Sequence, residues 1–118
     1  MKLLRRSDLL ALETTGRRTG RRRRVPLAYW VTDEGSYMVG GGAAGMTRVD
    51  WVANLRAVPQ AVVWVGRRPM AVTARELEGE ECEVGRAEAF RRWPGARRYE
   101  ARSGRRIPYF ELRKTVEQ

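Results

Sequence analysis

Short runs in which apolar and polar residues alternate recur along the chain, and they predict a protein built largely from antiparallel strands. The clearest pair covers residues 60–66 and 70–77, which we expect to form a hairpin around the turn "RRP". Its apolar positions, which should carry the core, are Val63, Val65, Met70, Val72 and Ala74.

Four further segments complete the predicted strands. Residues 8–15 suit a short helix or a strand, and their position just before a glycine turn favours a strand. Residues 25–32 and 37–41 flank the turn sequence "DEGS" and predict a second hairpin. The last strand is expected at 107–113, with Pro108 near its start, where a missing N–H donor is tolerated.

Two or three helices should lie between these strands. Thr47 and Asp50 have capping-box spacing at the head of a helix over 48–58. A second helix is expected at 79–93, and a short one at 96–103. The second helix should bury an apolar face made of Val84, Ala87, Phe90 and Trp93.

This order of elements, without regular alternation of strand and helix, predicts an α+β fold. We expect a small split β-barrel of about six mainly antiparallel strands, with two or three helices packed outside. At 118 residues the chain should form one domain over 1–118.

The charge is large and unevenly placed. The chain has 24 basic and 14 acidic residues, a net charge of +10, and residues 1–24 contribute +7 of it, from nine basic and two acidic residues. All but two of the basic residues are arginine, whose planar fork of donors matches phosphate and carboxylate groups. The N-terminal part is therefore expected to face an anion.

Several kinds of chemistry are disfavoured. The chain contains no histidine, which argues against a zinc site and against a Ser-His-Asp triad, so no metal is expected. Cys82 is the only cysteine and is expected to be structural in a reducing compartment. The N-terminal apolar stretch is interrupted by charges, which favours a cytoplasmic protein without a membrane segment.

Three stretches are candidates for binding. The arginine-rich loop 16–24, "GRRTGRRRR", could gather guanidinium groups on one anion, could be a plain solvated loop, or could contact nucleic acid. The small-residue stretch 40–45, "GGGAAG", matches no nucleotide-binding fingerprint but would let the backbone approach a flat ring. Trp93 and Tyr99 could wall a pocket or simply pack.

Three stretches in this order, "LETTGRRTGRRRRVPLAYW", "WVANLRAVPQAVVWVG" and "YEARSGRRIPYFEL", resemble the deazaflavin-dependent nitroreductase and quinone-reductase family. The similarity spans about residues 9–113. It implies a split-barrel oxidoreductase that uses coenzyme F-420 (8-hydroxy-5-deazaflavin), with FMN as an alternative cofactor. It also implies a small-molecule substrate and a monomer or homodimer.

The resemblance assigns roles to individual positions. The coenzyme's phosphate and oligoglutamate tail would be held by Arg17, Arg18 and Arg23. Its ring would lie against a strand that starts at Pro26 and Leu27. Backbone amides would come from Gly41, Gly42, Ala43, Ala44 and Gly45. The substrate would be capped by Trp93, Ala96 and Tyr99, with the Tyr99 hydroxyl or water as proton source.

The reaction expected from this resemblance is hydride transfer from reduced coenzyme to an electron-poor quinone, enone, imine or nitro compound. Relatives of the nitroreductase type carry tyrosine where this chain has Ala96, which argues against nitroimidazole activation. Two other functions stay open. One is a non-catalytic split-barrel protein that binds a flavin, haem or other small ligand, and the other is a basic nucleic-acid-binding module.

Overall fold

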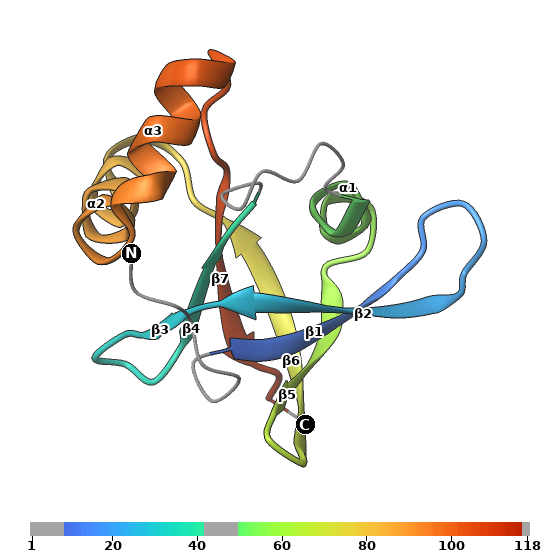
Figure 1. Cartoon of the computed structure of the whole chain (residues 1–118). Helices are drawn as coiled ribbons and strands as arrows, with labels where there is room; N and C mark the ends of the chain where they lie inside the picture. Colours follow the sequence, from blue (N-terminus) through green and yellow to red (C-terminus); the bar gives the residue numbers. More distant parts are fainter. Residues whose placement is uncertain (1–8, 42–49, 117–118) are drawn as a thin grey trace.

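The computed structural model describes residues 9–41 and 50–116, and these form seven strands and three helices (Figure 1). The strands are β1 (Leu9–Thr15), β2 (Arg22–Ala28), β3 (Trp30–Val31), β4 (Tyr37–Gly40), β5 (Gln60–Val65), β6 (Arg68–Glu76) and β7 (Tyr109–Lys114). The helices are α1 (Asp50–Ala57), α2 (Gly79–Arg92) and α3 (Pro94–Ser103).

All seven strands belong to one antiparallel sheet in the order β2-β1-β5-β6-β7-β4-β3. Its two edge strands, β2 and β3, are consecutive in the chain and separated only by Tyr29. One extended segment therefore pairs first with β1 and then with β4, so the sheet must curl into a half-barrel. The expected α+β split barrel with antiparallel strands and outer helices is confirmed.

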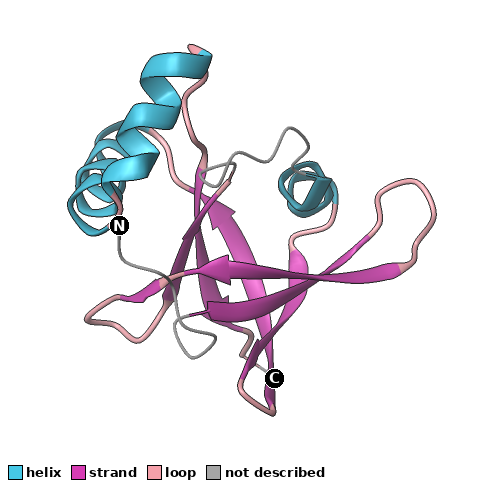
Figure 2. Ribbon diagram, in the orientation of Figure 1, coloured by secondary structure: helices cyan, strands magenta, loops and turns pink. Residues whose placement is uncertain are grey.

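Two apolar cores fill the structure. The larger lies inside the curled sheet and beneath α1; it contains Leu10, Leu12, Leu27, Val39, Trp51, Val52, Leu55, Ala61, Val63, Val72, Phe110 and Leu112. The smaller lies beneath α2 and α3; it contains Trp30, Met38, Leu77, Ala89, Ala96, Ile107 and Tyr109. Figure 2 shows the two groups of helices on separate sides of the mouth of the barrel, α1 on one side and α2 with α3 on the other.

Most predicted elements are found, and two differ. The single strand expected at 25–32 is split at Tyr29, because its two parts pair with opposite edges of the sheet. The apolar face expected for α2 is wrong for Val84 and Ala87, which are exposed, while Gly85, Arg86 and Ala89 are buried instead. Val84 and Ala87 border an open groove of about 820 Å³ between α2 and the sheet.

Candidate active site

The hairpin between β1 and β2 carries the arginine-rich segment away from the barrel (Figure 1). Its turn is closed by hydrogen bonds from the Gly16 N–H to the Arg21 carbonyl (2.7 Å) and from the Gly20 N–H to the Gly16 carbonyl (2.8 Å). Gly20 has a φ of +73°, a conformation that glycine adopts without steric cost. The loop expected over 16–24 is thus shorter, because β2 begins at Arg22 and pairs with Thr15.

A buried asparagine in α1 holds this hairpin. Asn54 accepts hydrogen bonds at Oδ1 from the backbone N–H of Arg17 (3.2 Å) and from its guanidinium (2.9 Å). Its Nδ2 donates to Thr14 Oγ1 (3.2 Å), and Asp50 lies 3.7 Å from the Arg17 guanidinium. Arg17, which the resemblance assigns to the coenzyme, is therefore also the residue that ties the loop to α1.

Helix α1 is itself fixed to the sheet at its other end. Arg56 donates two hydrogen bonds of 2.8 Å to the carboxylate of Glu76 in β6, and these bonds lower the pKa of Glu76. Asn54 and Arg56 both belong to the sequence "WVANLRAVP", which carries the resemblance. Sequence reasoning treated that stretch only as a helix and assigned no role to either residue.

The arginines of the hairpin divide between the two faces of the sheet. On the outer face, Glu13 pairs with Arg24 (2.8 Å) and Arg22 (3.7 Å), and the Arg24 guanidinium lies 4.1 Å from the centre of the Trp64 ring. Within the described part of the chain, three hairpin arginines have no acidic partner: Arg18, Arg21 and Arg23.

Arg23 lies in β2, where the register fixes its face, whereas Arg18 and Arg21 lie in the turn. Arg23 stands opposite Thr14, whose side chain is buried against Asn54, so Arg23 belongs to the face of β2 that looks toward α1. Arg18 and Arg21 are exposed in the turn. The structure therefore places Arg17 against α1 and Arg23 on the sheet face that looks toward α1, while Arg18 lies in the turn together with Arg21, which sequence reasoning did not single out.

The predicted ring-contact residues of β2 lie on opposite faces. Leu27 is buried in the larger core, opposite Leu10. Pro26 is exposed and stands opposite Ala11, on the same face as Arg24. Because β2 is an edge strand, its outward backbone groups are available to a ligand, whereas the Leu27 side chain is not.

The end of β4 lies between the two groups of helices. A Cβ built on Gly41 would come within 2.6 Å of Val52 Cγ2 in α1 and 3.3 Å of Pro108 Cγ, so only glycine fits there without movement. The Gly41 N–H already donates to the Pro108 carbonyl (2.9 Å), which leaves it unavailable to a ring. The remaining candidates for backbone contacts, Gly42, Ala43, Ala44 and Gly45, lie outside the described residues, as does Thr47, the residue expected to cap the helix.

The expected substrate wall lies at the junction of α2 and α3. Ala96 is buried in the smaller core, and Trp93 and Tyr99 are half-buried and pack against the same core. The centres of the Trp93 and Trp30 rings are 5.7 Å apart. All three residues thus belong to or pack against one core, and α2 and α3, which cover it, lie on the side of the barrel mouth away from the arginine hairpin (Figure 1).

The described residues hold neither a cluster of potential metal ligands nor a helix suited to crossing a bilayer. No group of three or more potential metal ligands occurs there. Within the same ranges, no helix has the length and apolar character needed to cross a bilayer.

Comparison with known proteins supplies the context for this geometry. The model of the F420H(2)-dependent quinone reductase family matches residues 1–113. A solved F420-H2 dependent reductase, FDR-A, is 32% identical, with a TM-score of 0.76 over 95% of this chain and 98% of its own. A domain-swapped dimer, also 32% identical with a TM-score of 0.76, covers 95% of this chain and 84% of its own.

More distant structures share the fold alone. The haem storage protein HutZ from Vibrio cholerae is 17% identical, with a TM-score of 0.66 over 94% of this chain and 84% of its own.

Proposed function

Because the chain belongs to the F420H(2)-dependent quinone reductase family, we propose that it reduces a quinone, or a related electron-poor enone, imine or nitro compound. It is an F420-dependent reductase, and coenzyme F420 is its cofactor. This family membership favours the reductase over the ligand-carrier and nucleic-acid alternatives.

The observation that carries the proposed binding mode is the set of arginines on the β1–β2 hairpin that have no acidic partner among the described residues. The coenzyme's tail is a chain of phosphate and carboxylate groups, and Arg18, Arg21 and Arg23 offer guanidinium groups that no described acidic residue neutralises. The donor chemistry of the hairpin therefore fits this coenzyme. Arg17 keeps the hairpin against α1 through its hydrogen bonds to Asn54 and its ion pair with Asp50.

The flat ring of the coenzyme is proposed to lie across the mouth of the barrel, between α1 and α3. Gly41 supports this placement, since its missing side chain lets the end of β4 approach α1 closely. The indole Nε1 of Trp51 in α1 is buried without a hydrogen-bond partner among the described residues, which leaves one polar donor on this side.

When bound in reduced form, the coenzyme supplies a hydride to the acceptor. The chain's own contribution is to hold the two flat molecules in contact and keep water away from them. Trp93 and Tyr99, both half-buried, provide the wall for the acceptor, whereas Ala96 is buried in the smaller core that they pack against. The Tyr99 hydroxyl holds the proton that the reduced acceptor oxygen takes up.

The test is a fluorescence titration of the protein with oxidised coenzyme F420, followed by steady-state reduction of a soluble quinone. Arg23→Ala should weaken coenzyme binding by about tenfold, because a charge-assisted hydrogen bond of roughly 1.5 kcal/mol or more is lost. Arg22→Ala is the matched control, since Arg22 is the adjacent arginine on the opposite face of the same strand. Equal affinities of the two variants would contradict the proposed tail site.

A further inference from the structure

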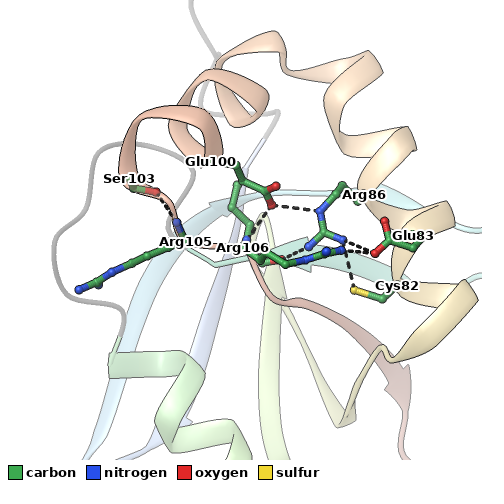
Figure 3. A network of polar contacts seen from close by, with 8 residues as sticks. Cys82, Glu83, Arg86, Glu100, Ser103, Arg105 and Arg106 are labelled. Atoms are coloured by element: carbon green, nitrogen blue, oxygen red, sulfur yellow. Dashed lines mark hydrogen bonds and ion pairs between the residues drawn. The ribbon is translucent and has the colours of Figure 1, made fainter.

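A buried arginine in α2, Arg86, is the centre of a network of polar contacts that the proposed function does not use (Figure 3). Arg86 is 7% exposed, and its guanidinium donates to Glu100 Oε2 (3.1 Å), Glu83 Oε1 (3.1 Å) and the Ile107 carbonyl (3.2 Å). It also lies 3.8 Å from the Cys82 sulfur. One side chain thereby contacts α2, α3 and the segment that leads into β7.

Glu100 of α3 completes this junction. The same oxygen that receives the Arg86 N–H also accepts the backbone N–H of Ile107 at 2.7 Å. Its side chain is only 17% exposed, and that of Arg86 is 9% exposed. A charge so far removed from water is stable only while its partner and hydrogen bonds are in place, so removing either residue leaves the other uncompensated.

Apolar contacts contribute little to holding α3 against the rest of the molecule. Ala96 is the one residue of this helix that is fully buried, and most of the others are arginine or other polar residues. The side chain of alanine contributes little apolar area. The position and tilt of α3 therefore depend on the polar contacts at Glu100 more than is usual for a helix of ten residues.

Glu100 is also placed next to the proposed acceptor wall. It follows Tyr99 directly in α3, so a shift of Glu100 moves Tyr99. The coenzyme tail site lies on the other side of the barrel mouth, on the β1–β2 hairpin (Figure 1). A disturbance at Glu100 should therefore affect acceptor binding and leave coenzyme binding unchanged.

We propose that Arg86 and Glu100 are positioning residues that fix α3, and with it Tyr99 of the proposed acceptor wall, at the mouth of the barrel. The part of this inference that concerns the acceptor rests on the proposed function. Neither residue touches the acceptor; both act through the placement of α3.

The experiment compares Glu100→Ala and Glu100→Gln with the wild-type protein, using menadione as the quinone at saturating reduced coenzyme. Glu100→Ala should raise KM for menadione by about tenfold, since small misplacements of a binding wall have large effects. Glu100→Gln keeps an oxygen that can accept from Arg86 and Ile107 and should recover most of that loss. The Kd of coenzyme F420, measured by fluorescence, should stay within twofold of wild type in both variants.

Glu88→Gln is the matched control. Glu88 also lies on α2 and pairs with two arginines, Arg91 and Arg92, but on the exposed surface. This variant should leave both KM and Kd unchanged. A purely structural role for Glu100 would lower the unfolding temperature without changing KM, and that result would overturn the proposal, as would KM and Kd rising by the same factor.

Hydrogen exchange separates this proposal from the proposed function. If the wild-type protein binds the coenzyme but reduces no quinone, the proposed acceptor fails, and the positioning of α3 is then judged from exchange rates. Faster exchange confined to α3 in Glu100→Ala, with α1 and β5 unchanged and with most of the change reversed in Glu100→Gln, would support the positioning role. Exchange that is unchanged in α3, or faster throughout the protein, would overturn it.

Discussion

The buried hydroxyl of Tyr109 predicts a loss of stability at alkaline pH that one substitution should remove. Tyr109 is 2% exposed, and its hydroxyl has no hydrogen-bond partner among the described residues. Its ring fills the space beside Gly40, where an added Cβ would lie 2.6 Å from Tyr109 Cε1. Burial raises the pKa of Tyr109 to about 12, with a further contribution from the nearby charge of Glu100.

The size and sign of the effect follow from that pKa. In the unfolded chain a tyrosine has a pKa of about 10, so between pH 10 and 12 the unfolded state loses a proton that the folded state keeps. The free energy of unfolding is unaffected by Tyr109 below about pH 9 and decreases as the pH rises through this interval. At pH 11 the decrease is about 1.4 kcal/mol, one pH unit at 1.36 kcal/mol.

The assay is urea unfolding of the wild-type protein and of Tyr109→Phe at pH 8 and pH 11. At pH 8 the variant should be as stable as the wild type or slightly more so, because a hydroxyl without a partner contributes nothing when buried. At pH 11 the variant should be more stable by a further margin of about 1.4 kcal/mol. Other groups titrate equally in both proteins, so the difference isolates Tyr109.

Two results would refute this reasoning. A stability difference that does not change between pH 8 and pH 11 would show that the hydroxyl ionises normally. A loss of more than about 1 kcal/mol at pH 8 would show that the hydroxyl has a hydrogen-bond partner in the folded protein.

Three further substitutions test the site. Asn54→Ala should lower the free energy of unfolding in urea by about 2 kcal/mol and weaken coenzyme binding, because it leaves Arg17 and Thr14 without their buried partner. Wild-type affinity for the coenzyme would contradict the role of α1 in placing the hairpin. Gly41→Ala should lower the free energy of unfolding by about 1–3 kcal/mol, since the new Cβ would clash with Val52 Cγ2. Adding Val52→Ala to the same chain should restore part of that stability in urea unfolding. Tyr99→Phe should slow turnover by about a hundredfold while coenzyme affinity is kept, and an unchanged kcat would exclude its hydroxyl as the proton source.

Strands with one buried face were predictable from the sequence. In β1 the residues alternate between half-buried and buried positions, with Leu10 and Leu12 inside, and the expected range of 8–15 agrees with Leu9–Thr15. In the hairpin of β5 and β6, Val63 and Val72 are fully buried as expected. In the β5–β6 hairpin the alternation is a local property of the sequence, so it can be read without knowing the partner strand, whereas β1 was predicted only from its position before a glycine turn.

Features that depend on distant partners could not be read in this way. The break at Tyr29 exists because the segment changes partner from β1 to β4, and nothing in its own composition marks that change. The face of α2 was misjudged because Arg86 looks like a surface residue until Glu100, fourteen positions later, is brought beside it. The role of Asn54 was missed for the same reason, because its partner Arg17 lies 37 positions away in the sequence.

The arginine-rich hairpin was predicted from the sequence only in part. The excess of arginine predicted an anion-binding segment, but the six arginines between Arg17 and Arg24 are not equivalent, and their count does not show which are free. In a strand, neighbouring side chains point to opposite faces, so Arg22 and Arg24 meet Glu13 while Arg23 lies toward α1. The position of one acidic residue, together with the two-residue period of β2, therefore determines which arginines remain for a ligand, and Arg23 is the one within that strand that has no described acidic partner.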